Sequence, residues 1–575
     1  MFLLFHHYRI VTLGPPEAGK YSTIESLKSQ KPVLVEKRTR VADWKSWYVT
    51  ATETVQIYDE GGQNIYRITS PVFNTTNSIP MLMHDAKKVT HTDLECTSQI
   101  LRETLQHHPE NQIVVVLTHI DEITEETLAK NNTVIKKKFQ SVIQKVINAL
   151  EVSACGNVTN KRQLISLLEK QKDGLMFFPV SSKTFQGMAE LTAFVKGILE
   201  KKSVVLPSKW VQLFKMMSDR DVPYWNYGEL VTLFRKLYST TAKVFQRSKI
   251  DSKCLAAVTY FRDVGLLLFY DSVPLLNQYV FHKPKFVLNL LKSTFHHDLE
   301  SQLNYDRSED LQSKFKRNEL KLMMKQYQQD GLLSGKLLSA LWQKHNLDDK
   351  NKQALQHLLE AFNLCHQVSI NHELFYFPWF VQNNVCPEAA TPPNLHKFDK
   401  KVMSVHFECK FVCDIPFNLF EVASVQLQKT ATNRKYEGER YAWRDGLLIK
   451  IDTLTCILQR NNKTATIYVS VCGKAEDADT IWMVMTDVHG DFENSLKPYK
   501  GVIEEIYFLC SHCIIKRKLE ILKLEPQHVL HSTTPDISFL TCGDDEFPRG
   551  LVRAFSGRLV MLNAKCSKFT QSVIS

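Results

Sequence analysis

The chain has 575 residues, which is too long for a single hydrophobic core, so we expect it to divide into three or four domains. Hydrophobic residues make up 44% and charged residues 23%, which are ordinary values for a globular protein. No apolar run approaches the ~20 residues that cross a bilayer, so no transmembrane segment is expected.

The formal net charge of +11 is spread along the chain, and its one tight cluster is Lys136-Lys137-Lys138. Apolar residues recur at three and four positions around this cluster, from Ile135 and Phe139 to Leu150, which predicts an amphipathic helix. We therefore interpret the lysines as a solvated helix face and expect no nucleic-acid partner. Contact with an acidic membrane surface is the alternative. Thirteen cysteines, an odd number, suit free thiols in a reducing compartment, so the expected location is cytoplasmic.

The first predicted element is a short buried strand, Ile10–Leu13, and it runs directly into a glycine-containing loop that ends in Gly19-Lys20. A helix is predicted to follow over Thr23–Leu27. In this arrangement backbone N–H groups surround a triphosphate, the helix dipole favours the negative charge, and the lysine neutralises phosphate oxygens. The predicted phosphate-binding residues are Gly14, Glu17, Ala18, Gly19, Lys20, Tyr21 and Ser22.

A second strand, Val55–Asp59, ends in a carboxylate and precedes Glu60-Gly61-Gly62-Gln63. Asp59 is suited to hold Mg²⁺ through a water molecule, while the Gly62 N–H can sense a γ-phosphate. Gln63 can orient the attacking water and is the predicted catalytic residue. The alternatives are a structural ion pair for Asp59 and an ordinary surface glutamine at position 63.

Two further strands end in polar residues that can recognise a base. Ile113–Leu117 is followed by Thr118, His119 and Asp121, and the aspartate can accept two hydrogen bonds from guanine that adenine does not offer. Phe177–Val180 leads into a loop for backbone contacts to the guanine O6. That loop contains Ser181, Ser182 and Lys183. Because ligands of open α/β sheets bind at the carboxyl ends of the strands, these segments predict one nucleotide site.

The phosphate loop departs from the expected pattern at three positions. The residue after Lys20 is Tyr21 rather than a Ser or Thr whose hydroxyl binds Mg²⁺, and Ser22 lies about 100° further around the helix. Pro15 and Pro16 remove two N–H donors. We expect nucleotide binding with a weakened Mg²⁺ site and slow hydrolysis; a loop that binds nothing is the alternative. Thr39 is the predicted switch threonine, with Thr50 and Thr52 as rivals.

The order of these motifs resembles the Roc domain, the Ras-like GTPase of the ROCO family. The resemblance rests on Asp59-x-Gly61-Gly62-Gln63 and on Thr118-His119-x-Asp121, where Thr-His replaces the Asn-Lys of small GTPases. In this family a COR domain follows, and Asp263–Tyr270 and Pro378–Val381 resemble COR segments. The resemblance implies GTP and GDP as ligands, weak GTPase activity, a homodimer formed through COR, and a signalling role with partner proteins that the sequence does not name.

The expected fold is an α/β Ras-like P-loop GTPase domain followed by an α-rich, winged-helix-like half and a mixed α+β half of a COR domain. The predicted boundaries are 1–202 for Roc, 203–388 for the helical COR half, 402–520 for the strand-rich half and 521–575 for a C-terminal extension. Strands are predicted in the strand-rich half at Val405–Phe411, Leu447–Leu458, Thr464–Val471 and Thr480–Thr486, from their β-branched and aromatic content.

A cysteine pair near the end of the chain, Cys510 and Cys513, has the spacing of a zinc knuckle, and Cys542 or Cys566 could add a ligand. Ordinary buried cysteines are the alternative.

For the whole chain the competing functions are a slow GTPase that controls its COR domain, a scaffold without hydrolysis, and an ATPase. The residues Thr118 to Asp121 disfavour the ATPase.

Overall fold

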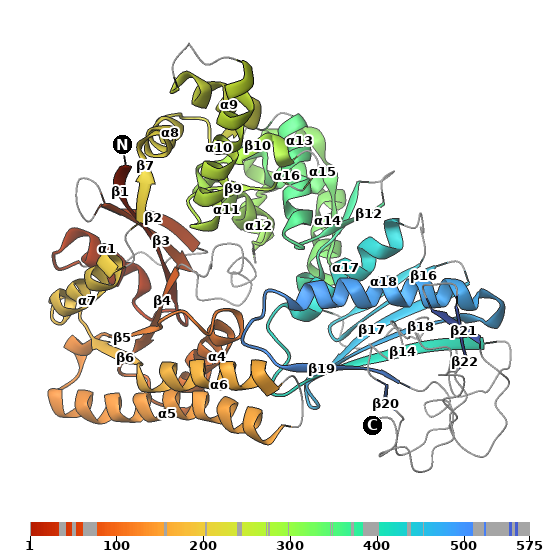
Figure 1. Ribbon diagram of the computed structural model, residues 1–575, viewed down its shortest axis with the longest axis horizontal. Helices are drawn as coiled ribbons and strands as arrows, with labels where there is room; N and C mark the ends of the chain where they lie inside the picture. The colour runs from red at the N-terminus through yellow and green to blue at the C-terminus, as the bar shows by residue number, and fades with distance from the viewer. Residues whose placement is uncertain are drawn as a thin grey trace. The chain divides into compact units, whose positions relative to one another are not determined.

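The computed structural model describes residues 2–33, 42–48, 53–60, 78–153, 158–201, 204–238, 244–271, 273, 276–296, 298–345, 347, 349–369, 373–382, 402–433, 439–451, 453–509, 523–524, 551–554 and 558–561 (Figure 1). The chain divides into two compact units, which are described separately. One contains Met1–Asn148, Arg162–Asn304 and Ser339–Ala361, and the other contains Ala149–Lys161, Tyr305–Leu338 and Phe362–Ser575. No helix among the described residues is long and apolar enough to cross a membrane.

The first unit is built on a seven-stranded sheet with the order β2-β3-β1-β4-β5-β6, in which β7 also pairs with β1. Strands β3, β1, β4, β5 and β6 are parallel, while β2 and β7 run antiparallel to their neighbours. This confirms the four strands predicted from the sequence. The bounds are β1 Phe2–Leu13, β2 Ala42–Tyr48, β3 Glu53–Glu60, β4 Ser78–Asp85, β5 Val114–Thr118, β6 Met176–Pro179 and β7 Val204–Pro207.

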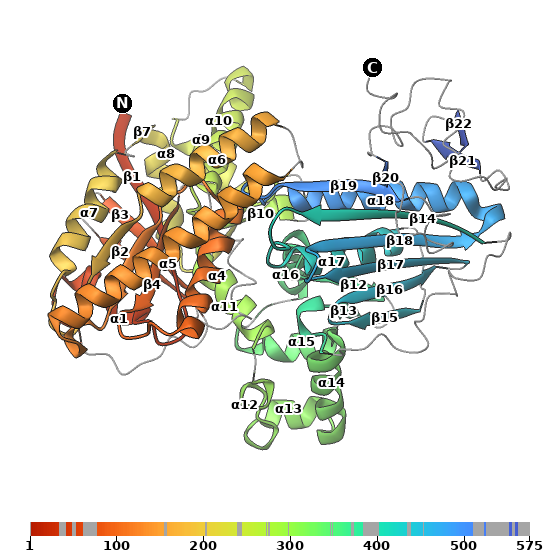
Figure 2. The same cartoon turned by 90° about the horizontal axis from the view of Figure 1, so that it is seen from below.

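Helices cover both faces of this sheet, which explains why its strands are continuous apolar runs. On one face α1 (Lys20–Ser29) and α7 (Met188–Lys201) lie side by side, and their apolar residues share a core with alternate residues of the strands. Figure 2 shows α4 (His91–His107), α5 (Glu125–Val152) and α6 (Val158–Asp173) together. The stripe predicted on α5 is confirmed, since Ile135 and Phe139 are fully buried.

A helical region with a small antiparallel sheet follows β7 in the same unit. The sheet has the order β8-β10-β9, and helices pack around it through a core that includes Phe234, Phe261 and Val280. The bounds are α8 Ser208–Ser218, β8 Tyr224–Asn226, α9 Tyr227–Lys236, α10 Val244–Asp263, β9 Leu268–Phe269, β10 Tyr279–Phe281, α11 Pro284–Thr294, α12 Leu299–Gln302 and α16 Asp349–Ala361. This region therefore combines small helices with short strands; the predicted boundaries of the first COR half stay a prediction.

One buried arginine links this helical region to the centre of the parallel sheet through a hydrogen bond. Arg9 of β1 is 2% exposed, and its guanidinium donates a hydrogen bond to the carbonyl of Gly265, in the turn after α10. Gly265 has a φ of 75°, and a Cβ there would collide with the guanidinium. Burial lowers the pKa of Arg9 to about 9, although Tyr58 opposes this shift. The strand that leads into the phosphate loop is therefore tied to the helical region.

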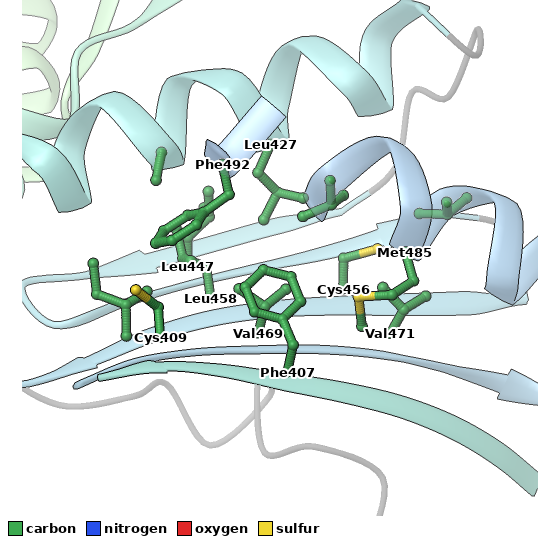
Figure 3. Packing of buried hydrophobic residues seen from close by; sticks show 14 of the residues in the cluster. Phe407, Cys409, Leu427, Leu447, Cys456, Leu458, Val469, Val471, Met485 and Phe492 are labelled. Carbon is green, nitrogen blue, oxygen red and sulfur yellow. The ribbon is translucent and has the colours of Figure 1, made fainter. Parts of the chain in front are cut away.

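The second unit contains a seven-stranded sheet with the order β15-β16-β17-β18-β14-β19-β20, antiparallel throughout. Helices α17 and α18 lie on one face, where Leu427, Met485 and Phe492 pack onto residues such as Phe407 and Val469 (Figure 3). The bounds are β14 Val402–Phe411, α17 Leu419–Asn433, β15 Arg440–Trp443, β16 Gly446–Ile451, β17 Leu454–Asn461, β18 Thr466–Lys474, α18 Ala478–Leu496, β19 Glu504–Leu509 and β20 Lys523–Leu524.

Smaller elements complete this unit. A three-stranded sheet has the order β11-β13-β12, and β21 and β22 form a separate hairpin. The bounds are α13 Glu309–Lys314, α14 Arg317–Asp330, β11 Leu332–Ser334, α15 Gly335–Leu341, β12 His366–Ser369, β13 Leu374–Tyr376, β21 Leu551–Ala554 and β22 Arg558–Met561.

Two predictions for the strand-rich half were wrong. Thr480–Thr486 lies inside helix α18, because its buried residues Ile481, Val484, Met485 and Val488 recur at three and four positions, which is the helical period. Leu447–Leu458 is a hairpin of β16 and β17 and not a single strand. For the helix, the β-branched composition favoured a strand although the period is helical; for the hairpin, the missed feature is the turn between Ile451 and Leu454. The fold class was correct: a Ras-like domain followed by a COR-type region.

Candidate nucleotide site

The phosphate loop between β1 and α1 has the tight backbone that its glycines predict. Gly14 has a φ of 146°, and a Cβ there would lie 2.4 Å from the carbonyl oxygen of Met83 in β4. Gly19 has a φ of 68° and precedes α1 without a side-chain cap. Glu17 adopts a left-handed φ of 64°, which is uncommon for a residue with a side chain. The loop is therefore held close to the sheet in a strained conformation.

Lys20 lies inside this loop. Its side chain is 6% exposed, and its Nζ donates to the carbonyl oxygens of Gly14 and Pro15, each at 2.7 Å. Two backbone carbonyl acceptors thus hold the ammonium group at the centre of the loop. A buried positive charge beside the N-terminus of a helix favours an anion at this point.

Thr118, at the end of β5, connects the predicted base-recognition segment to the phosphate loop. Its Oγ1 lies 3.2 Å from the carbonyl oxygen of Ala18 and 3.3 Å from that of His84. The Thr118 side chain is 2% exposed, and a Cβ on Gly19 would contact it at 3.2 Å. Two segments that are about 100 residues apart in sequence are therefore joined side by side at the carboxyl edge of the sheet.

His119 continues this connection towards β4. Its Nδ1 lies 3.3 Å from Oδ2 of Asp85 and 3.2 Å from Oγ1 of Thr118. Burial alone would raise the pKa of Asp85, but the hydrogen bond with His119 and that from the Lys87 N–H together lower it. Asp85 is therefore an ionised, buried group that orients His119.

Asp121 is half-buried in a short 3-10 helix, Ile120–Glu122, that follows His119 directly. The neighbouring loop after β6 is anchored by Ser181, which is fully buried and whose Oγ accepts a hydrogen bond from the Thr184 N–H. Ser182 contacts α1, since its Oγ lies 3.2 Å from Oγ1 of Thr23. The structure thus gathers both predicted base-recognition loops at one sheet edge with α1, while Lys183 is exposed.

Several predicted site residues lie outside the described residues. These are Thr39 with its rivals Thr50 and Thr52, Gly62 and Gln63, and the cysteines Cys510, Cys513, Cys542 and Cys566. Asp59 belongs to β3, but its side chain is also outside the described part. Among the residues that the structure describes, no group of three or more His, Cys, Asp or Glu could hold a metal ion. The zinc knuckle stays a prediction.

Domains of the Ras-like GTPase class generally associate with Mg²⁺ together with their nucleotide, and a hydroxyl in the first turn of α1 is its protein ligand. Here that position is Tyr21, whose ring lies beneath the ammonium group of Lys45 at 3.5 Å from the ring centroid. An aromatic ring in contact with a cation does not fit direct coordination of a second cation. The residues described at this point therefore do not reproduce the usual Mg²⁺ site.

Two residues of this site were not singled out from the sequence. Asp85 ends strand β4, but only the fold brings it to His119. Lys45 lies in β2, next to a part of the chain without a recognisable motif. A carboxylate at the end of a buried strand was an available signal for Asp85, whereas we find none for Lys45.

The sequence of the site region matches a known domain family. Residues 9–121 match the model of "Ras of Complex, Roc, domain of DAPkinase". The match begins in β1 and ends at Asp121, so it includes the phosphate loop and the Thr118–Asp121 segment.

Related proteins extend the likeness beyond this domain. The chain is 20% identical over 594 residues to the malignant fibrous histiocytoma-amplified sequence 1 homolog of Xenopus tropicalis, covering 93% of this chain and 57% of that protein. It is 20% identical to the human protein of that name over 58% of this chain and 34% of that protein. A probable serine/threonine-protein kinase, pats1 of Dictyostelium discoideum, is 20% identical over 80% of this chain and 12% of its own length.

The chain thus spans less than two thirds of the length of each of these relatives. Among solved structures, Methanosarcina barkeri Roco2 RocCORdC bound to GDP aligns with a TM-score of 0.42 and 16% identity, covering 66% of this chain and 98% of that one. The Roc match at the site, together with relatives that align through the region beyond it, shows that this chain resembles proteins of the ROCO family over most of its length.

Proposed function

We propose that this chain is a guanine-nucleotide-binding signalling protein that hydrolyses GTP slowly in its Roc domain. The observation that carries the proposal is the bond between Thr118 and Ala18, because it joins the phosphate loop to the predicted base-recognition segment. A phosphate-binding loop alone does not select a base. The loop is connected to Asp121 through Thr118 and His119. This connection supports a site that binds both the phosphates and the base of a nucleotide.

Each predicted residue has a physical role in this proposal. Lys20 exchanges its two carbonyl acceptors for phosphate oxygens, and Gly14 allows the loop to approach the sheet closely. Asp121 accepts hydrogen bonds from the guanine N1 and N2 groups, which adenine cannot supply. The loop from Ser181 to Lys183 lies beside it for contacts to O6, and His119 is oriented by Asp85.

Hydrolysis depends on Gln63, which would orient the attacking water, and on Asp59, which would hold Mg²⁺ through water. Tyr21 favours slow hydrolysis of GTP, because it replaces the Ser or Thr whose hydroxyl positions the metal. The competing function is a scaffold that binds nucleotide without hydrolysing it. Single-turnover measurement with labelled GTP separates the two: release of phosphate that Gln63→Leu abolishes supports a GTPase, and no release supports the scaffold.

Two further parts of the proposal lie outside the nucleotide site. From the family resemblance we infer that the chain self-associates through its COR region, and from its thirteen cysteines that it acts in the cytoplasm. Light scattering of the purified chain with GDP and with a GTP analogue tests the first part. A monomer in both nucleotide states would contradict it.

Guanine recognition is tested by the Asp121→Asn exchange. Loss of a charge-assisted hydrogen bond should weaken GDP binding by roughly 10- to 150-fold. Xanthosine diphosphate should then bind more tightly than GDP, because its 2-oxo group can accept a hydrogen bond from the new amide. Glu122→Gln is the matched control, since Glu122 is the adjacent acid and pairs with Lys87 on the surface.

The control variant should keep the wild-type affinity for GDP. If Asp121→Asn leaves both affinities unchanged while wild type binds GDP, the assignment of Asp121 to guanine recognition is wrong.

A further inference from the structure

In a Ras-like domain the residue after the phosphate-loop lysine supplies a hydroxyl to Mg²⁺, whereas here it is Tyr21, whose ring contacts an ammonium group of the protein itself. Lys45 is 9% exposed overall, and its Nζ lies 3.5 Å from the centroid of the Tyr21 ring. The same Nζ lies 3.1 Å from Oε1 of Glu25. A buried lysine at such a distance from an aromatic face forms a cation–π contact that is stronger than an exposed one.

The fold fixes the direction of this lysine. Lys45 and Trp47 are two residues apart in β2, so they point to the same face of the sheet. Trp47 is 3% exposed and packs in the core that α1 shares with the sheet. On α1, Tyr21 and Glu25 are separated by four residues and therefore lie on one face. Lys45 is thus held between two residues of the first turns of α1.

Tyr21 follows Lys20 directly, so the ring that carries the Lys45 ammonium is attached to the end of the phosphate loop. In the usual arrangement the hydroxyl at this position brings a divalent cation to the phosphates. Here the side chain at the same position contacts a monovalent cation, the ammonium group of Lys45. Because the lysine belongs to the folded chain, its positive charge is in place before the nucleotide binds. A metal ion, by contrast, must first bind from solution.

We propose that the Tyr21–Lys45 pair replaces Mg²⁺ in nucleotide binding by this chain, so that guanine nucleotides bind with the same affinity in the presence and absence of the metal. The inference rests on the proposed function, because it concerns the same site. It makes Lys45 a binding residue from β2, and it gives Tyr21 the role of positioning that lysine.

Glu25 pairs with Lys45 but does not cancel the positive charge at this point. Its carboxylate is shared with Lys28, whose Nζ lies 3.4 Å from the same Oε1. Lys28 lies one turn further from the phosphate loop and is about a quarter exposed. Lys28 is therefore a natural control: it is a second lysine at the same carboxylate, with no contact to Tyr21 among those that the structure gives.

The experiment is an equilibrium titration of the purified chain with fluorescent GDP, first with excess Mg²⁺ and then with EDTA. Wild type should change its affinity by less than about threefold between the two conditions. Lys45→Gln should lose roughly 10- to 100-fold in EDTA, and Lys45→Arg should retain most of the binding. Lys28→Gln should stay within about twofold of wild type in both conditions.

Two further variants separate the ring from the hydroxyl. Tyr21→Phe keeps the aromatic face and should behave like wild type. Tyr21→Ser restores the hydroxyl and removes the support of Lys45, so its binding should become dependent on Mg²⁺ by more than about tenfold. Thermal unfolding of each variant shows whether it folds; if Lys45→Gln does not, the wild-type and Tyr21→Ser titrations still decide the question.

The possible failures are distinguishable. If wild type binds GDP with Mg²⁺ and loses more than about tenfold in EDTA, this inference is wrong while the proposed function stands. If wild type binds no guanine nucleotide in either condition, the proposed function is wrong and this inference falls with it.

Discussion

The part of the chain that the structure describes contains two seven-stranded sheets that are built in opposite ways. In the first, helices cover both faces, and because β3, β1, β4, β5 and β6 are parallel, their carboxyl ends deliver loops to one edge. In the second, antiparallel strands alternate in direction, and the helices α17 and α18 pack on one face. Parallel strands therefore concentrate polar residues from distant parts of the sequence, whereas an antiparallel sheet distributes its loops over both ends.

The buried polar residues of the two sheets differ accordingly. At the edge of the first sheet, Thr118 contacts the phosphate loop that holds Lys20, and the adjacent His119 contacts Asp85, so these polar groups come from separate strands. In the second sheet, His406 is fully buried with Oγ of Ser404 at 2.8 Å from its Nε2, and the hydroxyl of Tyr468 bonds its Nδ1. That network satisfies itself within neighbouring strands. We therefore expect nucleotide binding to depend on the polar groups of the first sheet, and the polar network of the second sheet to contribute to stability alone.

The largest expected effect sharpens this comparison in the second sheet. Phe407 is fully buried, and its ring lies 5.6 Å from that of Phe492 and 6.1 Å from that of Phe508. Phe407→Ala leaves a cavity and should lower the unfolding free energy of this unit by about 3–5 kcal/mol, measured by urea denaturation. GDP affinity should not change. A loss below about 1 kcal/mol would contradict the packing described.

The next effect concerns the phosphate loop. Lys20→Ala removes the ammonium group from the loop and should weaken GDP binding by at least about a hundredfold, which corresponds to about 3 kcal/mol. Lys170→Ala, an exposed lysine of α6, is the control and should bind like wild type. If Lys20→Ala binds GDP as well as the control does, the site is wrongly assigned.

A pH effect should appear in the second sheet. Burial lowers the pKa of His406 to about 3, below the ordinary value of 6.5. The neutral ring is therefore the folded form, so its stabilising contribution is complete above pH ~6.5 and is lost as the pH falls towards the folded value. Between pH 6.5 and 5 the unfolding free energy should fall by about 2 kcal/mol from this group.

Denaturation of wild type and of His406→Gln at several pH values measures this slope. The variant should show the smaller decrease in unfolding free energy below pH ~6.5. Equal slopes for both proteins would mean that His406 titrates in the folded state as it does in the unfolded chain.

The smallest effect tests the link between the two loops of the nucleotide site. Thr118→Val keeps the volume but removes the hydroxyl that contacts Ala18 and His84. GDP binding should become less favourable by about 1 kcal/mol, in line with the loss of one buried hydrogen bond. Thr133→Val on the exposed face of α5 is the control. Tighter binding by Thr118→Val would contradict the proposed link.

The sequence predicted the first sheet better than the second. Four of the parallel strands, β1, β3, β5 and β6, run into a sequence motif at their carboxyl ends, so their positions could be predicted. In the unit of the second sheet, the buried residues from Ile481 to Val488 belong to helix α18. Their β-branched and apolar composition predicted a strand, although they recur at three and four positions as in a helix. Contacts between elements, such as Lys45 with Tyr21 and Arg9 with Gly265, leave no local pattern and required the fold.

The central claim is tested most directly by titrating the unmodified chain with GDP and with ADP under identical conditions, by isothermal calorimetry. The account predicts saturable binding of GDP to one site and binding of ADP that is weaker by at least about a hundredfold. Equal affinity for the two nucleotides would contradict the role of Asp121. No heat of binding from either would contradict the nucleotide site itself.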